Sequence, residues 1–139
     1  MPVIESKIMI NSKSFKKNQQ DHAKLIEEVR TLEKKIADNS ARSKEKFEKR
    51  GQLLPRDRLK KLLDPGSFWL PLSTLAGYKI GDDDGEKSIG WGNGIGGIGY
   101  VSGVRCMIGV SDAGIKGGSS SAMGVEKGLR GAQLSLIHI

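Results

Sequence analysis

The sequence predicts a mixed fold, α/β by class and α+β in this piece, in which N-terminal helices precede a β-hairpin and a further helix. Three observations predict it. Apolar residues recur at helical spacing in the N-terminal part of the chain. Two β-rich runs flank a two-residue turn, Ser102-Gly103. A glycine- and serine-rich segment then leads into a polar stretch that is typical of a helix.

The chain has 139 residues, of which 23 are basic and 16 acidic, so its formal net charge is +7. The positive surplus lies before residue 64, where 17 basic residues face 9 acidic ones, whereas the remainder has 6 and 7. Lysine and glutamate are interleaved in this arm and aromatic residues are few, a pattern typical of a solvated helix surface. We therefore do not expect nucleic acid among the partners.

Cysteine usage and hydropathy exclude several classes of protein. Cys106 is the only cysteine, which excludes a disulfide framework and a zinc ribbon, and we expect no bound metal. No apolar run approaches the ~18 to 20 residues that cross a bilayer. The first residues lack a secretory or transit pattern. These features predict a cytoplasmic protein without a membrane partner.

The N-terminal region divides into a disordered segment, residues 1–20, and a basic helical arm, residues 21–63. Asp21 is the expected N-cap of the first helix. Its apolar stripe, at 4-3-4 spacing, consists of Leu25, Val29, Leu32 and Ile36. We expect the helix to weaken at residues 39–40, to resume through Phe47, and to stop at Gly51.

A second, short helix is predicted in "LLPRDRLKKLLDPGS", because Pro55 suits a first helical turn. Its expected buried face is Leu59, Leu62 and Leu63, and residues 64–66 form a turn. The following "SFWLPLSTLAGY" is extended and apolar, and Pro71 restricts it to an edge strand or an irregular segment. "KIGDDDGEKSIGW" is predicted to be a polar, flexible loop.

The densest glycine run, "GWGNGIGGIGYVSGVRCMIGV", fits G-x-G-x-x-G twice, at Gly92, Gly94 and Gly97 and again at Gly94, Gly96 and Gly99. A dinucleotide-binding loop needs a strand before these glycines and a helix after them. Here an acidic loop precedes them, and a hairpin around the 102–103 turn follows. We therefore expect the glycines to permit bends and close strand approach.

The segment "SDAGIKGGSSSAMGVEKGLRGAQ" offers a candidate anion site ahead of a helix over residues 122–133. The favoured interpretation of its serines is an ordinary helix cap behind a turn. Gly124, Gly128 and Gly131 leave one helix face bare, which indicates either close packing of another backbone or an irregular loop. Cys106 is expected to be a small buried hydrophobic residue and not a nucleophile.

The last six residues, "LSLIHI", share no pattern with the helix before them. The codons CTG-TCT-CTT-ATA-CAC-ATC encode this string and resemble a transposase end sequence used in preparing sequencing libraries. We interpret residues 134–139 as an adapter-derived tail and exclude them from functional arguments. A genuine apolar C-terminal strand is the alternative.

Residues 51–133 resemble the start of the carboxyltransferase (beta) subunit of biotin-dependent acyl-CoA carboxylases. The resemblance rests on "LLPRDRLKKLLDPGSFWLPLSTLAGY", "GIGYVSGVRCMIGVSDAGIKGG" and "LRGAQ" taken together. Within the family, the Cys-Met-Ile strand and the K-G-G turn look most like the methylcrotonyl-CoA or geranyl-CoA branch. Departures are Ser111 and Gly114 in place of Asn and Thr, "SSSAMG" in place of an aromatic stretch, and an inserted Gly131.

The resemblance implies the first ββα unit of a crotonase-like (ClpP/crotonase) fold, truncated, with residues 64–133 as the start of the carboxyltransferase N-terminal domain. It implies a ligase subunit that transfers a carboxyl group from carboxybiotin to an acyl-CoA through a thioester enolate. The biotin would be carried by a biotin carboxylase or biotin-carrier partner, and the subunits would form a homo-oligomer. The fragment alone would be inactive.

The residues that match the family's motifs are Lys116, Gly117 and Gly118 in the K-G-G turn and Arg130 in the helix. The resemblance implies that the two cations lie toward the CoA phosphates and that the glycine pair lets the main chain approach the ligand. No catalytic residue is assigned within this chain. The competing interpretation is a small basic helical module that binds RNA or an acidic protein partner through residues 21–61.

Overall fold

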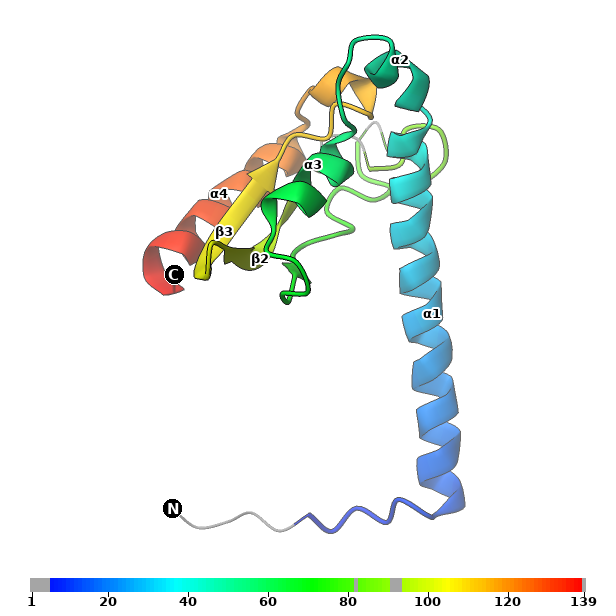
Figure 1. Cartoon of the computed structure of the whole chain (residues 1–139). Helices are drawn as coiled ribbons and strands as arrows, with labels where there is room; N and C mark the ends of the chain where they lie inside the picture. Colours follow the sequence, from blue (N-terminus) through cyan, green and yellow to red (C-terminus); the bar gives the residue numbers. More distant parts are fainter. Residues whose placement is uncertain (1–5, 82, 91–93, 139) are drawn as a thin grey trace. The chain divides into compact units, whose positions relative to one another are not determined.

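The computed structural model describes residues 6–81, 83–90 and 94–138, and the chain divides into two compact units, residues 1–32 and 33–139. Helix α1 (Lys13–Ala41) begins in the first unit and ends in the second (Figure 1). The Ser12 hydroxyl accepts a hydrogen bond from the Phe15 amide at 3.2 Å and caps the helix. The expected cap at Asp21 is therefore wrong, and residues 13–20, which we expected to be disordered, are helical.

The apolar stripe of α1 is confirmed as part of one helix, but its residues differ in burial. Leu25 and Val29 are 57% and 44% exposed, whereas Ile36, in the second unit, is only 4% exposed. Ile36 packs with Ile89 and Ile115. The C-terminal end of α1 thus contributes to the core of the second unit.

Polar side chains fix that end of α1 to the loop that follows the sheet. The Ser40 hydroxyl donates to Asp112 Oδ1 at 2.6 Å, and the Ser43 hydroxyl donates to the Gly114 carbonyl at 2.7 Å. A Cβ on Gly114 would lie 2.5 Å from the Ser40 carbonyl oxygen. The close approach explains why a glycine occupies position 114 in this chain.

The helical arm breaks and resumes close to where the sequence indicated. Helix α1 ends at Ala41, and a short helix, α2 (Lys44–Glu48), follows. The chain then turns at Gly51, whose φ is +64°. A left-handed conformation after a helix favours glycine, which confirms the predicted stop.

Helix α3 (Pro55–Leu62) starts with its proline as predicted. Leu59 is buried, but Leu62 is 48% exposed, so the predicted buried face is wrong at that residue. The Asp64 carboxylate accepts hydrogen bonds from the Ser102 and Gly103 amides, both at 2.7 Å. The end of α3 is thereby tied to the turn of the hairpin.

Among the described residues, three antiparallel strands form one sheet in the order β1-β2-β3. They are β1 (Leu70–Pro71), β2 (Ile95–Val101) and β3 (Val104–Val110). The predicted turn at residues 102–103 is confirmed, and so is the edge position of Pro71. Strand β2 begins at Ile95, earlier than the hairpin motif alone suggested.

The glycines of β2 allow close packing, as expected. A Cβ on Gly97 would collide with the Leu70 carbonyl oxygen, and one on Gly99 would lie 2.5 Å from Leu63 Cδ2. The chain after Gly97 continues as a strand and enters a hairpin. It does not open a helix, so the described part of the run fails the structural test for a dinucleotide loop; Gly92 lies outside the described residues.

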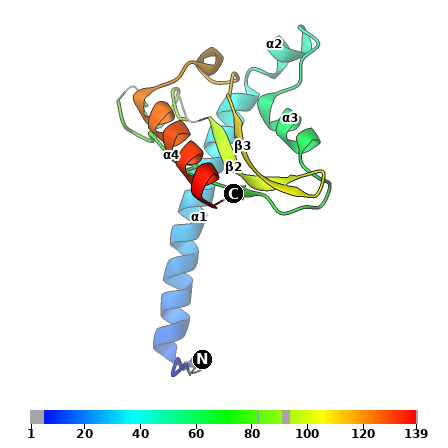
Figure 2. The ribbon, with the colours of Figure 1, turned by 90° about the vertical axis from the view of Figure 1, so that its left-hand side faces the viewer.

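Helices α3 and α4 (Ala122–His138) cover opposite faces of the hairpin (Figure 2). On the α3 side, Leu59 packs with Ile95 and Ile108. On the α4 side, the position of a Gly131 Cβ lies 3.0 Å from Met107 Cε. The order β2-β3-α4 is therefore a ββα unit.

In the acidic loop before β2, Asp83 and Asp84 accept hydrogen bonds from backbone amides of the described residues. Asp83 accepts from the Gly85 and Gly90 amides at 2.8 and 2.9 Å. Asp84 accepts from the Ser88 and Glu86 amides, and these bonds lower its pKa to about 2. The loop ends at Ile89, which is fully buried.

Candidate functional site

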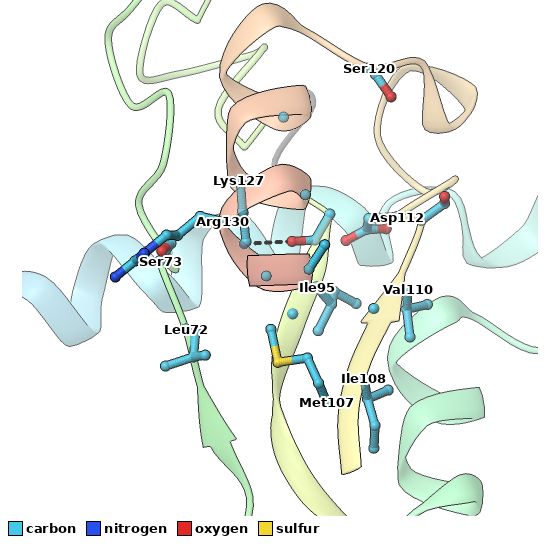
Figure 3. A pocket seen from close by; sticks show the side chains of 18 of the residues that line it. Leu72, Ser73, Ile95, Met107, Ile108, Val110, Asp112, Ser120, Lys127 and Arg130 are labelled. Carbon is cyan, nitrogen blue, oxygen red and sulfur yellow. Dashed lines mark hydrogen bonds between the residues drawn. The ribbon is translucent and has the colours of Figure 1, made fainter. Parts of the chain in front are cut away.

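A cavity of about 460 Å³ lies between α4, the hairpin and the segment that follows β3 (Figure 3). Its volume falls in the range of small-molecule sites. Apolar side chains that line it include Leu72, Ile95, Met107, Ile108 and Val110. Polar side chains that line it are Ser73, Asp112, Ser119, Ser120, Lys127 and Arg130. A mainly apolar site with a few polar groups suits a ligand of mixed character.

The bare face of α4 forms one wall of this cavity, through Gly124, Gly128 and Gly131. A Cβ on Gly128 would meet no heavy atom within 4 Å. The neighbour of Gly131 is the flexible end of the Met107 side chain and not a backbone. The expectation that another backbone packs against this stripe is therefore wrong for both residues, and the missing side chains leave space.

Lys127 projects from the same helix face, and its Nζ donates a 2.6 Å hydrogen bond to the Gly94 carbonyl (Figure 3). Burial, and then the positive charge of Arg56, lower the pKa of Lys127 from 10.5 to about 8. Sequence reasoning missed this residue. The sequence did contain a signal: Lys127 follows Gly124 by three residues and precedes Gly131 by four. Residues at these spacings lie on the same face of a helix.

The predicted Lys116-Gly117-Gly118 motif forms a tight turn, η1 (Lys116–Gly118), in which all three residues have positive φ, at 42°, 68° and 83°. Only glycine adopts such angles without strain, which explains the pair. Gly118 lines the cavity, and a Cβ there would lie 3.3 Å from Ala113 Cα. Lys116 and Gly117 are exposed and lie outside the described lining.

Arg130 lines the cavity, and its side chain extends toward Ser73 (Figure 3). Its Nη1 donates to Gln133 Oε1 at 3.3 Å, and the residue is otherwise exposed. The structure thus brings Arg130 and Gly118 to one cavity and leaves Lys116 and Gly117 on the surface of the adjoining turn. Their assignment to a CoA site stays a prediction.

The serine-rich start of α4 behaves as a helix cap. The Ser121 hydroxyl accepts a hydrogen bond from the Gly124 amide at 3.2 Å, and the Ser121 carbonyl accepts from Val125. This confirms the favoured interpretation of the serines. The helix runs on through residue 138, beyond the predicted end at Gln133.

Asp112 is a second lining residue that sequence reasoning did not select. It is 6% exposed, and its Oδ1 accepts from the Ser40 hydroxyl and from the Gly114 amide at 3.2 Å. Asp112 therefore joins the wall of the cavity to the end of α1. An aspartate within "SDAGIKGG" was the signal, but the motif alone does not tell structural from binding roles.

Two further properties bear on the chemistry. Cys106 is half-buried against the Leu59 cluster, in agreement with a packing role. Within residues 6–81, 83–90 and 94–138 no group of three or more His, Cys, Asp or Glu side chains is placed to hold a metal. Over the same residues no helix has the length and apolar character of a membrane span.

Comparison with known proteins shows which family the chain resembles and over which residues. The carboxyl transferase domain family matches residues 46–137. A probable mitochondrial methylcrotonoyl-CoA carboxylase beta chain of Drosophila melanogaster is 33% identical over 134 residues, covering 96% of this chain and 23% of that protein. The biotin-dependent 3-methylcrotonyl-coenzyme A carboxylase beta1 subunit of Mycobacterium tuberculosis is 40% identical over 117 residues. That alignment covers 84% of this chain and 21% of the Mycobacterium protein.

The crystal structure of the P. aeruginosa geranyl-CoA carboxylase beta subunit superposes with a TM-score of 0.85 at 44% identity. The superposition covers 97% of this chain and 25% of that one, so the chain spans about a quarter of the length of its solved relative. The expected start of a crotonase-like carboxyltransferase fold is confirmed, and the basic RNA-binding module finds no support. The chain belongs to the carboxyl transferase domain family.

Proposed function

We propose that this chain forms part of a subunit that transfers a carboxyl group from carboxybiotin to an acyl-CoA of the methylcrotonyl or geranyl type, through a thioester enolate. The observation that carries the proposal is the match to the carboxyl transferase domain over residues 46–137, together with beta-subunit relatives that cover nearly the whole chain. The relatives' names give the two acyl groups.

The hard step of this reaction is removal of a proton from a weakly acidic C–H next to, or conjugated with, a thioester. Hydrogen-bond donors aimed at the thioester oxygen stabilise the enolate charge as it develops. We assign no such donor to this chain, because the described residues contribute a wall, a turn and cations. Their role is to bind and orient the substrate.

Two features of the cavity suit an acyl-CoA. Its apolar wall, with the open face at Gly128, has room for a branched hydrocarbon chain. Arg130 at the rim and Lys116 on the adjoining exposed turn supply positive charge for phosphate groups. The positive φ of Gly117 and Gly118 keeps that turn narrow, so that main chain can approach a ligand closely.

Biotin supplies the activated carboxyl group in this chemistry and would arrive attached to a partner. The described residues hold no feature of a covalent biotin site that we can assign. They fit the group only as a mobile co-substrate that enters an open, mainly apolar cavity. A biotin carrier or biotin carboxylase subunit and a homo-oligomer of carboxyltransferase subunits belong to the proposal.

The test is kinetic and uses a carboxyltransferase subunit that contains this segment, assayed with its biotin-carrying partner. Replacing Lys116 or Arg130 with alanine should raise KM for acyl-CoA by roughly tenfold, about 1.4 kcal/mol, with little change in kcat. Free CoA should compete less well with substrate in both variants, because the lost contact is to the phosphates.

Lys61→Ala is the matched control, since Lys61 is an exposed lysine on the segment 55–63 and does not line the cavity. It should leave KM unchanged. An unchanged KM in the Lys116 and Arg130 variants would remove the phosphate contacts. Absence of carboxyl transfer from carboxybiotin to any methylcrotonyl- or geranyl-type thioester would remove the function itself.

A further inference from the structure

We propose that Arg56 and Lys127 hold a small oxyanion, a carboxylate or a phosphate, in a second cavity on the α3 side of the hairpin. This cavity has a volume of about 300 Å³. Arg56 comes from the first turn of α3, and Lys127 reaches it from α4. Lys127 lines both cavities and so lies between them. The proposal does not depend on the carboxyltransferase assignment.

The first argument is an excess of positive charge in a confined space. Among the described residues that line this cavity, Arg56, Lys60 and Lys127 are basic and Glu33 is acidic. Arg56 and Lys127 are close enough for the arginine charge to lower the lysine's pKa. Two like charges held together in a partly buried place cost free energy, and a bound anion offsets that cost.

The second argument is an orphaned donor. Arg56 Nε is buried and has no hydrogen-bond partner among the described residues. A guanidinium presents Nε and one terminal nitrogen as a fork that matches two oxygens of a carboxylate or a phosphate. An oxyanion in the cavity would therefore satisfy Nε and pair with both cations.

The acidic residue in the cavity is already engaged by a neighbour. Glu33 Oε1 accepts a 2.7 Å hydrogen bond from the Thr74 hydroxyl. The Lys127 ammonium donates to the Gly94 carbonyl, which is a neutral acceptor. Basic side chains outnumber acidic ones among the described lining residues, which favours an anion from outside the chain.

The experiment titrates the 139-residue chain with inorganic phosphate and, in a separate arm, with acetate. The readout is the NMR signal of the arginine Nε–H groups at constant ionic strength. One Nε–H signal should shift with saturation, and it should be the signal that Arg56→Gln removes. The arm with the lower Kd identifies the oxyanion as phosphate or carboxylate.

Arg58→Gln is the matched control, because Arg58 lies two residues away on α3 but is exposed and does not line the cavity. Arg56→Gln should weaken binding of the preferred anion by at least about tenfold, as expected for a lost charged hydrogen bond. Arg58→Gln should leave Kd within a factor of two.

A pH series separates a built site from general attraction by a basic protein. In the acetate arm, where the anion is fully ionised above about pH 6, affinity should be constant from there to pH 8 and fall above it, as the free chain loses the Lys127 proton. Lys127→Arg keeps its charge at these pH values and should abolish the fall. These readouts involve neither acyl-CoA nor biotin, so their failure would leave the proposed function standing.

Three outcomes would overturn the proposal. Equal losses in the Arg56 and Arg58 variants would mean nonspecific screening. Absence of a saturable shift with either anion would mean that no site exists. A shift of the Arg56 Nε–H signal caused by Glu33→Gln alone, equal to that caused by the anion, would mean that an internal ion pair already fills the role.

Discussion

Glycines are concentrated in two regions of this chain, and they serve opposite purposes. In β2, Gly97 and Gly99 lie against Trp69, Leu70 and Leu63, so that added methyl groups would overlap existing atoms. In α4, Gly128 faces open space at the wall of the larger cavity. The space left by the missing side chains of β2 is filled by neighbouring residues, whereas the space beside Gly128 is part of the cavity.

The comparison teaches that glycine content alone does not tell a tight contact from an open one. In the strand, the glycines let the edge strand and the Trp69 ring approach β2, which builds the sheet. In the helix, each glycine costs about 1 kcal/mol relative to alanine. Since no backbone has moved in to use the space at Gly128, the helix bears a cost that folding of this region does not require.

The largest expected effect comes from filling the closed region. Gly97→Ala should destabilise the chain by about 3 kcal/mol, because its Cβ would overlap a backbone oxygen and lie 2.7 Å from the Trp69 ring. Denaturant unfolding measures the change. Gly109→Ala on the partner strand, where a Cβ would meet no atom within 4 Å, is the control and should stay within about 0.5 kcal/mol. Equal effects at the two positions would refute the contrast within the sheet.

A smaller effect of opposite sign is expected in the open region. Gly128→Ala should stabilise the chain by about 1 kcal/mol, because helix propensity improves and nothing is displaced. A thermal melt should show a higher Tm. Gly131→Ala is the matched variant, and its gain should be smaller, since Met107 Cε must move from 3.0 Å. A loss of stability at Gly128 would show that the wall is in fact closed.

The last effect depends on pH and concerns Lys127, which connects the two regions. Its Cε lies 3.5 Å from the position of a Cβ on Gly96, and its Nζ is bound to Gly94. Because its folded-state pKa, about 8, is below that of an unfolded lysine, about 10.4, the unfolded chain binds more protons between these values. The free energy of unfolding should therefore rise as the pH is raised from 8 toward 10. Below pH 8, the cost of burying the charged Lys127 amine should be constant.

Denaturation midpoints at several pH values measure this effect, and Lys127→Met should remove it. Arg56→Gln should raise the pKa of Lys127 only in part, because burial is the larger cause and the Arg56 charge the smaller. A Lys127 titration that stays near pH 10.5 would contradict the burial of this amine.

The sequence predicted correctly those helix, turn and strand positions at which a residue restricts the backbone by its own chemistry. Pro55 at a helix start, Ser102-Gly103 at a two-residue turn and Pro71 at a sheet edge each restrict the backbone directly, and all three were confirmed. The wrong predictions concern features that depend on which other residues lie nearby in the folded chain. Asp21 could cap a helix, but Ser12 does so earlier, and Leu62 has helical spacing but no neighbour to cover it.

The site was less accessible from sequence. The family motif selected Gly118 and Arg130, which do line the cavity, but nothing in a linear motif distinguishes them from Lys116 and Gly117, which do not. Lys127 acquires its unusual pKa from burial and from Arg56, a residue of a different helix. Such properties arise from long-range packing, which periodicity and spacing do not encode.

The Asp64 carboxylate accepts hydrogen bonds from both amides of the 102–103 turn. These bonds have a consequence for the orientation of side chains along the hairpin. Successive strand residues point to opposite sides, so a slip of one position would exchange Met107 and Ile108 between the two helices. The hydrogen bonds of Asp64 to the hairpin turn thus help to fix the register of the two strands. The "LLDPGS" stretch reads as a helix ending, yet the two hydrogen bonds of its aspartate favour the register in which Ile108 packs with Leu59 of α3 and Met107 lies beside Gly131 of α4.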